Sequence, residues 1–539
     1  MSSRITLGIA WGRTLVLATL LTLIGAALAA RGQAQANTLI IGQGNDTDSV
    51  DPHKTTAVLA VERLYNLYDT LVNLDFNMET ITPGLAESWR VSPDGKTYTF
   101  VLKRGVKFHS GKPLTAQDVK YSLDRWRDPK TASPTRNRIA EVEEVTAPDD
   151  FTVVIRVKDR SNYLLFNLAS GFASIVNPEA IKKHGANYGT LAVDGTGPFK
   201  LKEWVLRDRF VLERNPEYRW GPPMFKNKGP AKVERVVWRV IPEDATRLFE
   251  LEQGGGINVS RWIAFSELPR LRKDPKLRVI DYKVGYVVYL GFNMNKEIAQ
   301  DIRVRKALNH AIKKDDIVNE IFYGLGTPAQ GPVSPIVAGA WKDVGKAAYE
   351  YSPAKARALL DEAGWKPGPD GIRVKDGKRL VLPIHAIAGY GYPDTLTLIQ
   401  AQCREVGIDV EQVLLEEAAI WGRLAAGEHT VMAMGNPHSN PDEILMFYFH
   451  SKNRPTPNRF GFADPKVDAL LEEGRTNPDK KRLQEVYAEV QKKVIESAVW
   501  VPLWHPGRAM VMSVRVTDLR PHAVYDVGYH KLLDVSVAP

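Results

Sequence analysis

Residues 83–125 read PGLAESWRVSPDGKTYTFVLKRGVKFHSGKPLTAQDVKYSLDR, and two local signals stand out in this stretch. Residues 98–102 alternate in the way that a half-buried strand does. Ser92-Pro93-Asp94-Gly95 just before them is a turn sequence, because glycine supplies the positive φ that such turns need. The stretch therefore predicts a turn between strands.

Similar strand signals recur along the chain among helical segments. Ser352 and Pro353 supply an N-cap and a first-turn proline for a helix that Gly364 ends. A second helix of about four turns runs through residues 483–494. Mixed strands and helices in a chain of 539 residues predict an α/β protein of two or three domains. Further strands are expected at residues 38–42, 151–157, 233–241 and 284–292.

Composition excludes several classes of function. The chain has 72 Lys and Arg against 63 Asp and Glu, and the basic residues are dispersed rather than gathered in a block. A nucleic-acid partner is not expected, because tracking phosphates needs a concentrated basic surface. Cys403 is the one cysteine, so an intramolecular disulfide is impossible.

Residues 1–36 have the layout of a secretory signal peptide. Arg4 and Arg13 precede an apolar run over residues 15–30, and Ala34-Gln35-Ala36 offers a small-residue cleavage site. The alternative is a membrane anchor, for which the run is rather short. We predict cleavage near Ala36. No cysteine follows that could carry a lipid, so a diffusible periplasmic protein is expected.

Motifs for catalysis and cofactor binding are missing. The chain lacks a P-loop, a dinucleotide GxGxxG, a GxSxG elbow, HExxH and paired CxxC. Eleven histidines and one cysteine form no cluster with metal-ligand spacing. We therefore predict no catalytic residues, no metal site and no cofactor, although carboxylate pairs distant in sequence leave an exported hydrolase open.

Four long stretches resemble one family, the family 5 extracellular solute-binding proteins of ABC transporters, whose members include dipeptide, oligopeptide and nickel binders. The resemblance implies a two-lobed, type II-like periplasmic binding protein with a hinged cleft and an extra domain inserted in the first lobe. The stretches are residues 83–125, 195–221, 289–318 and 351–378.

Mapping the family fold onto this chain gives expected boundaries. The first lobe would comprise residues 37–85, 193–287 and 505–539, with the inserted subdomain at 86–192. Residues 288–504 would form the second lobe. The two hinge segments would fall near residues 288–293 and 502–506.

The resemblance also implies a function. The protein would be the periplasmic solute-binding component of an ABC importer, a monomer that captures a peptide-like solute and delivers it to a permease and ATPase in the inner membrane. Alternatives are a non-peptide ligand such as an opine, a sugar-containing compound or a metal complex, and a sensor or chaperone that works without a transporter.

The resemblance places candidate ligand contacts on two loops and nearby aromatic residues. Peptide-binding relatives carry an aspartate for the ammonium group and an arginine for the carboxylate, and both are missing at the matching positions here. We therefore hypothesise that the ligand is not an ordinary zwitterionic peptide held at both ends. Asp442 could take the ammonium role or cap the following helix. The candidates are Asn45, Asp46, Thr55 and Thr56 in the first lobe, and Tyr289, His385, Trp421, Asn436, His438, Asn440, Asp442 and Trp504 in or beside the second.

Overall fold

A computed structural model describes residues 37–538, apart from residues 255, 262 and 524–527. The predicted signal peptide lies outside the described residues. Among the described residues, twelve strands form one sheet with the order β19-β18-β20-β13-β21-β11-β1-β10-β9-β8, and β12 and β14 also pair with β21. Their bounds are β1 (Thr38–Gln43), β8 (Phe199–Val205), β9 (Arg209–Arg214), β10 (Arg235–Val240), β11 (Val259–Ser260), β12 (Leu277–Lys283), β13 (Tyr286–Phe292), β14 (Gly326–Pro328), β18 (Val381–Ile387), β19 (Asp409–Leu415), β20 (Val431–Pro437) and β21 (Trp500–Ser513).

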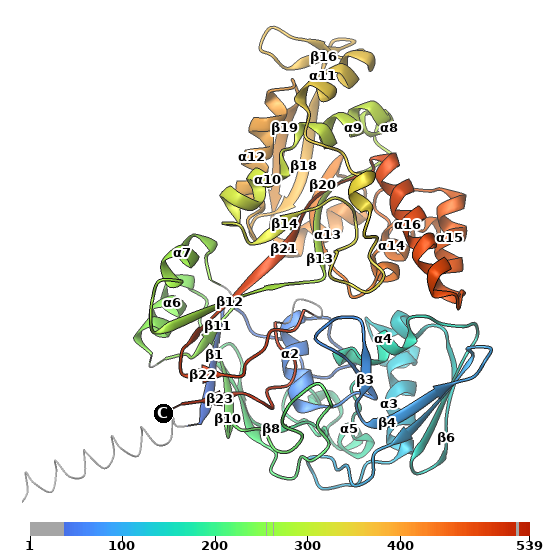
Figure 1. The fold of residues 1–539 in the computed structure, drawn as a ribbon, viewed down its shortest axis with the longest axis vertical. Coiled ribbons are helices and arrows are strands. Elements are labelled where there is room, and N and C mark those ends of the chain that lie inside the picture. The colour runs from blue at the N-terminus through green and yellow to red at the C-terminus, as the bar shows by residue number, and fades with distance from the viewer. Residues whose placement is uncertain (1–36, 255, 262, 524–527, 539) are drawn as a thin grey trace, which may run out of the picture.

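Two segments link the two lobes of this α/β fold (Figure 1). The 14-residue strand β21 pairs with β13 over Trp500–Trp504 and with β12 over Gly507–Ser513, so it belongs to both lobes. The chain crosses a second time between β12 and β13. At that crossing the Gly285 carbonyl accepts a 2.7 Å hydrogen bond from the His438 backbone N–H. A Cβ on Gly285 would lie 2.1 Å from the His438 carbonyl oxygen, which explains the glycine.

A separate four-stranded sheet lies within residues 86–157. Its order is β4-β5-β7-β6, and α3 packs against β6 and β7. Gly95 has φ +72° at the end of the predicted turn, and the predicted strand at 98–102 is part of β5. These two local predictions are confirmed. The elements are β4 (Ala86–Val91), β5 (Thr97–Leu102), α3 (Ala116–Arg127), β6 (Val142–Asp149) and β7 (Thr152–Val157).

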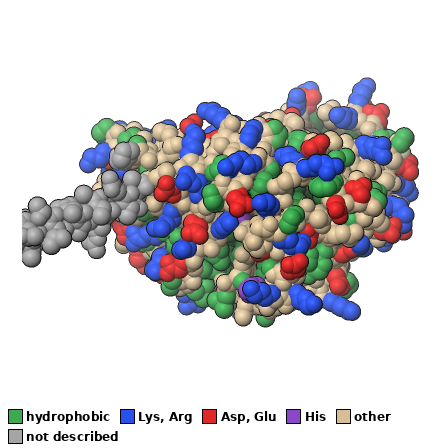
Figure 2. All heavy atoms as spheres, turned by 90° about the horizontal axis from the view of Figure 1, so that it is seen from below, with side chains coloured by type: hydrophobic (Ala, Val, Ile, Leu, Met, Phe, Trp, Pro, Cys, Tyr) green, Lys and Arg blue, Asp and Glu red, His purple; other side chains and the backbone are tan. Residues whose placement is uncertain are grey.

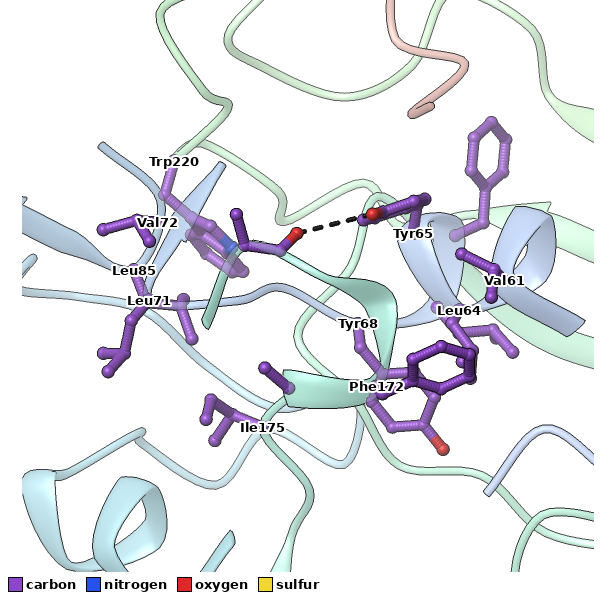
Figure 3. Packing of buried hydrophobic residues seen from close by; sticks show 14 of the residues in the cluster. Val61, Leu64, Tyr65, Tyr68, Leu71, Val72, Leu85, Phe172, Ile175 and Trp220 are labelled. Atoms are coloured by element: carbon purple, nitrogen blue, oxygen red, sulfur yellow. Dashed lines mark hydrogen bonds between the residues drawn. The ribbon is translucent and has the colours of Figure 1, made fainter. Parts of the chain in front are cut away.

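Helix α2 (Val58–Leu67) contributes buried apolar side chains to the core of the first lobe. Figure 3 shows Val61, Leu64 and Tyr65 of this helix packed near Phe172. The Tyr65 hydroxyl donates a 3.4 Å hydrogen bond to the Ala169 carbonyl. Burial of these side chains fixes α2, and with it the loop that precedes the helix, against the lobe.

In the second lobe, several helices pack against its part of the sheet. Ser352 caps α11 by accepting from the Lys355 backbone N–H at 3.3 Å, as predicted. The second predicted helix, at 483–494, is confirmed within α16. The main helices are α9 (Ile302–Ala311), α11 (Pro353–Glu362), α12 (Tyr392–Arg404), α13 (Glu417–Ala425), α14 (Pro441–Phe449), α15 (Pro465–Thr476) and α16 (Lys480–Ser497).

Shorter elements complete the described fold. Their bounds are β2 (Val72–Leu74), β3 (Ile81–Pro83), α4 (Leu164–Leu168), α5 (Pro178–His184), α6 (Asp244–Gln253), α7 (Leu268–Leu271), α8 (Glu297–Gln300), α10 (Lys314–Asp316), β15 (Lys366–Pro367), β16 (Arg373–Lys375), β17 (Lys378–Arg379), β22 (Val516–Thr517) and β23 (Ser536–Val537). The domain boundaries given above stay predictions.

The surface carries both signs of charge. On the face shown in Figure 2, Lys and Arg side chains are interspersed with Asp and Glu. Among the described residues, none of the helices has the length and apolar character that crossing a bilayer requires.

Candidate ligand site

Three strands of the second lobe end at one edge of the sheet. β18 is parallel to both β19 and β20, so the loops after all three strands leave from the same edge. Tyr390 lies in the first loop, α13 with Trp421 follows the second strand, and residues 438–440 form the third loop. In open α/β sheets ligands bind outside the carboxyl ends of the strands. This edge is therefore the candidate ligand-binding edge of the second lobe.

His438 in the third loop holds protein segments together. Its side chain is fully buried, and Nε2 accepts a 2.8 Å hydrogen bond from the Ser334 backbone N–H. Nδ1 lies 3.2 Å from the Asn436 carbonyl, to which the Nδ1-protonated tautomer donates. Burial lowers the pKa of His438 to about 4, so the ring is neutral. With both ring nitrogens used, His438 acts as a structural link beside the crossing, and its predicted ligand contact stays untested.

The two acids that follow this loop, in the first turn of α14, both have cationic partners. Asn440, and not Asp442, caps α14 by accepting from the Glu443 backbone N–H at 2.9 Å, so the capping interpretation of Asp442 is wrong. Asp442 is buried and lies 3.1 Å from Arg475 Nε. Glu443 lies 2.7 Å from Arg138, a residue of the predicted insert. Neither carboxylate is therefore left without a cation in the described structure.

Asp442→Asn is expected to raise the free energy of unfolding by about 1–3 kcal/mol at pH 7. Burial raises the pKa of Asp442 from 3.8 to about 6, while Arg475 opposes the shift. The folded protein then binds more protons than the unfolded chain between these values, so this carboxyl favours folding at low pH and loses that contribution as the pH rises. Urea denaturation from pH 4 to 7 measures the effect.

The Asp442→Asn variant and the parent should be equally stable near pH 4, and the gap should open by about pH 6. A gap that stays constant over this range would contradict the assignment. Asp464→Asn is a useful reference, because Asp464 accepts two backbone hydrogen bonds at the start of α15 and is not deeply buried.

Two of the three predicted stacking aromatics lie in the core. Tyr289 is 1% exposed and stacks on Trp500 with ring centroids 3.4 Å apart and an interplanar angle of 7°. Trp504 is also buried and packs against Phe322 at 4.6 Å. Trp421, in contrast, is 41% exposed. Of the three, Trp421 is the one that the structure leaves open to a ligand.

The first-lobe candidates divide in the same way. Asn45 and Thr56 are exposed, and Thr55 is buried and accepts from the Ala57 backbone N–H at 3.1 Å. Asp46 forms a 3.1 Å ion pair with the buried Arg63 and accepts a 3.0 Å hydrogen bond from Trp204. Asp46 and Thr55 therefore shape the loop, whereas Asn45 and Thr56 are accessible.

His385 lies in the middle of β18, opposite Met432 of β20. Its ring centroid is 6.5 Å from that of His429, and burial together with nearby Arg423 lowers the pKa of His385. Among the described residues, His, Cys, Asp and Glu side chains form no group of three that could hold a metal. The predicted ligand contact of His385 stays a prediction.

A cavity of about 420 Å³ lies between the predicted insert and the second lobe. Beside it, the Asn162 side chain donates to the Gly474 and Asn477 carbonyls at 3.0 and 2.8 Å, so the two parts of the chain are in direct contact. None of the cavity's residues was a sequence candidate, because they come from distant segments. Those that line it include Glu141, Arg160, Tyr163, Met446, Lys452 and Arg475.

Sequence reasoning also missed Arg459, which lies beside Trp421, and Tyr448, which bonds to the candidate Asn436. The Arg459 guanidinium carbon lies 5.5 Å from the Trp421 ring centroid. The Tyr448 hydroxyl accepts a hydrogen bond from the Asn436 side chain. The sequence around Arg459 contains Pro455 and Pro457 and is typical of a solvated loop, so it carried no signal for a site.

Comparison with known proteins identifies the family. Residues 80–456 match the family description "Bacterial extracellular solute-binding proteins, family 5 Middle". The chain belongs to this family. The family resemblance seen in the sequence is thus confirmed, together with the α/β solute-binding fold.

Individual family 5 relatives cover nearly the whole chain. The Escherichia coli K12 protein named "Probable D,D-dipeptide-binding periplasmic protein DdpA" is 29% identical over 89% of this chain and 90% of its own length. DppA from Helicobacter pylori, solved with the peptide STSA, is 27% identical with a TM-score of 0.78 over 94% of this chain and 98% of DppA. NikA from Brucella suis, solved with Fe(III)-EDTA, is 25% identical with a TM-score of 0.81 over 93% of this chain and 99% of NikA.

Proposed function

We propose that this protein is the periplasmic solute-binding component of an ABC importer, which captures a small solute between its lobes and delivers it to a membrane permease. Membership of family 5 supports this role. The two crossings, at β21 and between β12 and β13, suit a pair of lobes that close around a ligand. The cavity between the insert and the second lobe offers space of the size that small-molecule sites have.

The proposed solute class rests on the two acids in the first turn of α14, directly after the third loop. Asp442 is paired with Arg475 and Glu443 with Arg138, so neither acid is available to a ligand's ammonium group without breaking an ion pair. A buried ammonium without a carboxylate partner is unfavourable. The proposed solute is therefore a modified peptide, an opine-like compound or a related molecule, rather than a zwitterionic peptide held at both ends.

Export follows from the sequence of residues 1–36. Cleavage near Ala36 would release a chain that begins close to β1, with no cysteine for lipid attachment. A diffusible protein in the periplasm would then carry the solute to the permease.

Native mass spectrometry of the protein purified from the periplasm tests the proposal. The expected spectrum contains the chain cleaved near Ala36 together with a bound small molecule, whose mass identifies the solute. Titration calorimetry with Ala-Ala and Ala-Ala-Ala then tests the solute class. Micromolar binding of these plain peptides would overturn the proposed class, and turnover of the co-purified molecule would overturn the transport role.

A further inference from the structure

We propose that the predicted insert carries an interlobe clasp, which stabilises the closed arrangement of the two lobes and so sets how firmly the solute is retained. This inference rests on the proposed function, because it concerns retention of the captured solute. Figure 1 shows the region around α4 of the insert facing α14, α15 and α16 of the second lobe. The clasp comprises Arg138, Asn162 and Tyr163 of the insert, which contact Glu443, Tyr487 and the end of α15. It is a connection additional to the two crossings, because none of its residues belongs to β12, β13 or β21.

Tyr163 places an aromatic ring of the insert among buried side chains of the second lobe. Its ring centroid lies 6.2 Å from that of Tyr487 in α16, with an interplanar angle of 69°. Tyr163 is 9% exposed and belongs to the same buried cluster as Leu471 and Tyr487. Moving the lobes apart would expose this ring to water, so the hydrophobic effect favours the closed arrangement.

Asn162 bonds to the C-terminal end of α15 in the second lobe. Its backbone N–H donates to the Arg475 carbonyl at 3.0 Å, and its side chain donates to the Gly474 and Asn477 carbonyls at 3.0 and 2.8 Å. The last carbonyls of a helix have no N–H partner within the helix. Asn162 supplies such partners from the insert, and its three hydrogen bonds fix the insert against the end of α15.

The contact between Arg138 and Glu443 connects the clasp with the candidate ligand-binding edge. Arg138 lies 2.7 Å from one carboxylate oxygen of Glu443. The other oxygen accepts from the backbone N–H and the hydroxyl of Ser439 in the third loop, at 2.8 and 2.9 Å. Asn167 donates a 2.6 Å hydrogen bond to the Arg138 carbonyl and so helps to position the arginine. One carboxylate therefore joins the insert to the third loop, which couples the position of that loop to closure of the clasp.

The clasp borders the cavity of about 420 Å³ between the insert and the second lobe. Tyr163 lines this cavity from the insert, and Met446 and Arg475 line it from the second lobe, so opening the clasp would separate its walls. If only the closed arrangement retains the solute, the apparent dissociation constant is the intrinsic constant divided by the closed fraction. Arg138 and Asn162 are not among the residues that line the cavity, so substituting them changes closure and keeps the cavity walls.

A distance measurement between the insert and the second lobe tests the clasp directly. Lys130→Cys and Lys480→Cys place one exposed cysteine on each side, and the native Cys403 is buried. Double electron–electron resonance between spin labels on these two cysteines then reports how far apart the two parts lie. The mature protein is measured after dialysis that removes the solute, so that closure by the solute does not mask the clasp. The parent should show mainly one short distance.

Arg138→Gln and Asn162→Ala, introduced separately and together, should each move a measurable fraction of the molecules to longer distances, with the largest fraction in the combined variant. Arg136→Gln is the matched control, because Arg136 is an exposed arginine two residues from Arg138. It should give the distances of the parent. Distances in the combined variant that match those of the parent would overturn the proposal. Circular dichroism checks that each variant is folded, and the separate substitutions keep the test available if the combined one unfolds.

Solute retention is the second readout. In native mass spectrometry of protein purified from the periplasm, the combined variant should retain at least about threefold less solute than the parent, because its closed fraction is smaller. Unchanged retention in a variant with longer distances would overturn the link between the clasp and the solute, and the proposed function would stand. A parent that carries no solute and binds none would count against the proposed function, whereas the distance measurement would still decide whether the clasp exists.

Discussion

Replacing Lys531 by methionine is expected to lower the free energy of unfolding by about 3–5 kcal/mol. Lys531 and Asp69 are each 4% exposed, and Nζ lies 2.8 Å from Asp69 Oδ1. Asp69 also accepts hydrogen bonds from Tyr218 at 3.0 Å, Trp220 at 3.0 Å and Thr196 at 2.9 Å. Removing the cation leaves the aspartate buried with neutral partners alone, and this uncompensated charge is the source of the loss.

Lys531 has a second role that methionine cannot replace. Its Nζ donates to the Tyr65 and Tyr68 carbonyls at 2.6 and 2.7 Å, next to the C-terminal end of α2. Lysine at this position therefore connects residue 531 to the end of α2, one of the helices packed in the first-lobe core. Urea denaturation followed by tryptophan fluorescence measures the change in stability.

Two controls separate burial of the charge from loss of a side chain. Lys226→Met removes an exposed ion pair to Asp518 at 3.1 Å and should cost less than about 1 kcal/mol. The double variant Asp69→Asn with Lys531→Met should recover part of the loss, because it removes the buried anion as well. Equal losses for Lys226→Met and Lys531→Met would contradict the role of burial.

Local patterns predicted the elements well, because their signals lie within a few neighbouring residues. The strands expected at 38–42, 151–157, 233–241 and 284–292 are found as β1, β7, β10 and β13. Each has the apolar, β-branched composition that fits a buried sheet. The capped helix α11 is also found, because its N-cap, first-turn proline and stop glycine all lie within residues 352–364.

The candidate site was harder to predict, because its polar side chains take their partners from distant segments. The His438 ring accepts a hydrogen bond from the Ser334 backbone, and Asp442 forms an ion pair with Arg475. The sequence around residues 438 and 442 does not predict these partners. Arg459 shows the converse: it is a loop arginine of ordinary appearance that the fold places beside Trp421, with no carboxylate partner among the described residues. Residue types along a loop indicate what chemistry is available, whereas tertiary pairing decides which groups remain free for a ligand.

Tyr289→Ala is expected to lower the free energy of unfolding by about 3–5 kcal/mol, and this result would separate a core aromatic from a ligand platform. The Tyr289 ring stacks on Trp500, and its centroid lies 6.2 Å from that of Tyr448 and 6.0 Å from that of Phe460. Alanine would leave a cavity in this buried cluster that close packing cannot fill. Thermal and urea denaturation would measure the loss.

Trp421→Ala is the matched substitution for Tyr289→Ala, because it also removes one of the predicted stacking aromatics. Trp421 is 41% exposed, so its loss should cost about 1 kcal/mol or less in stability while weakening capture of the solute found by native mass spectrometry. Tyr289→Phe, which keeps the ring, should retain both stability and capture. If Tyr289→Phe abolished capture in a stable protein, the Tyr289 hydroxyl would have to reach the solute, and the core position assigned to this residue would be wrong.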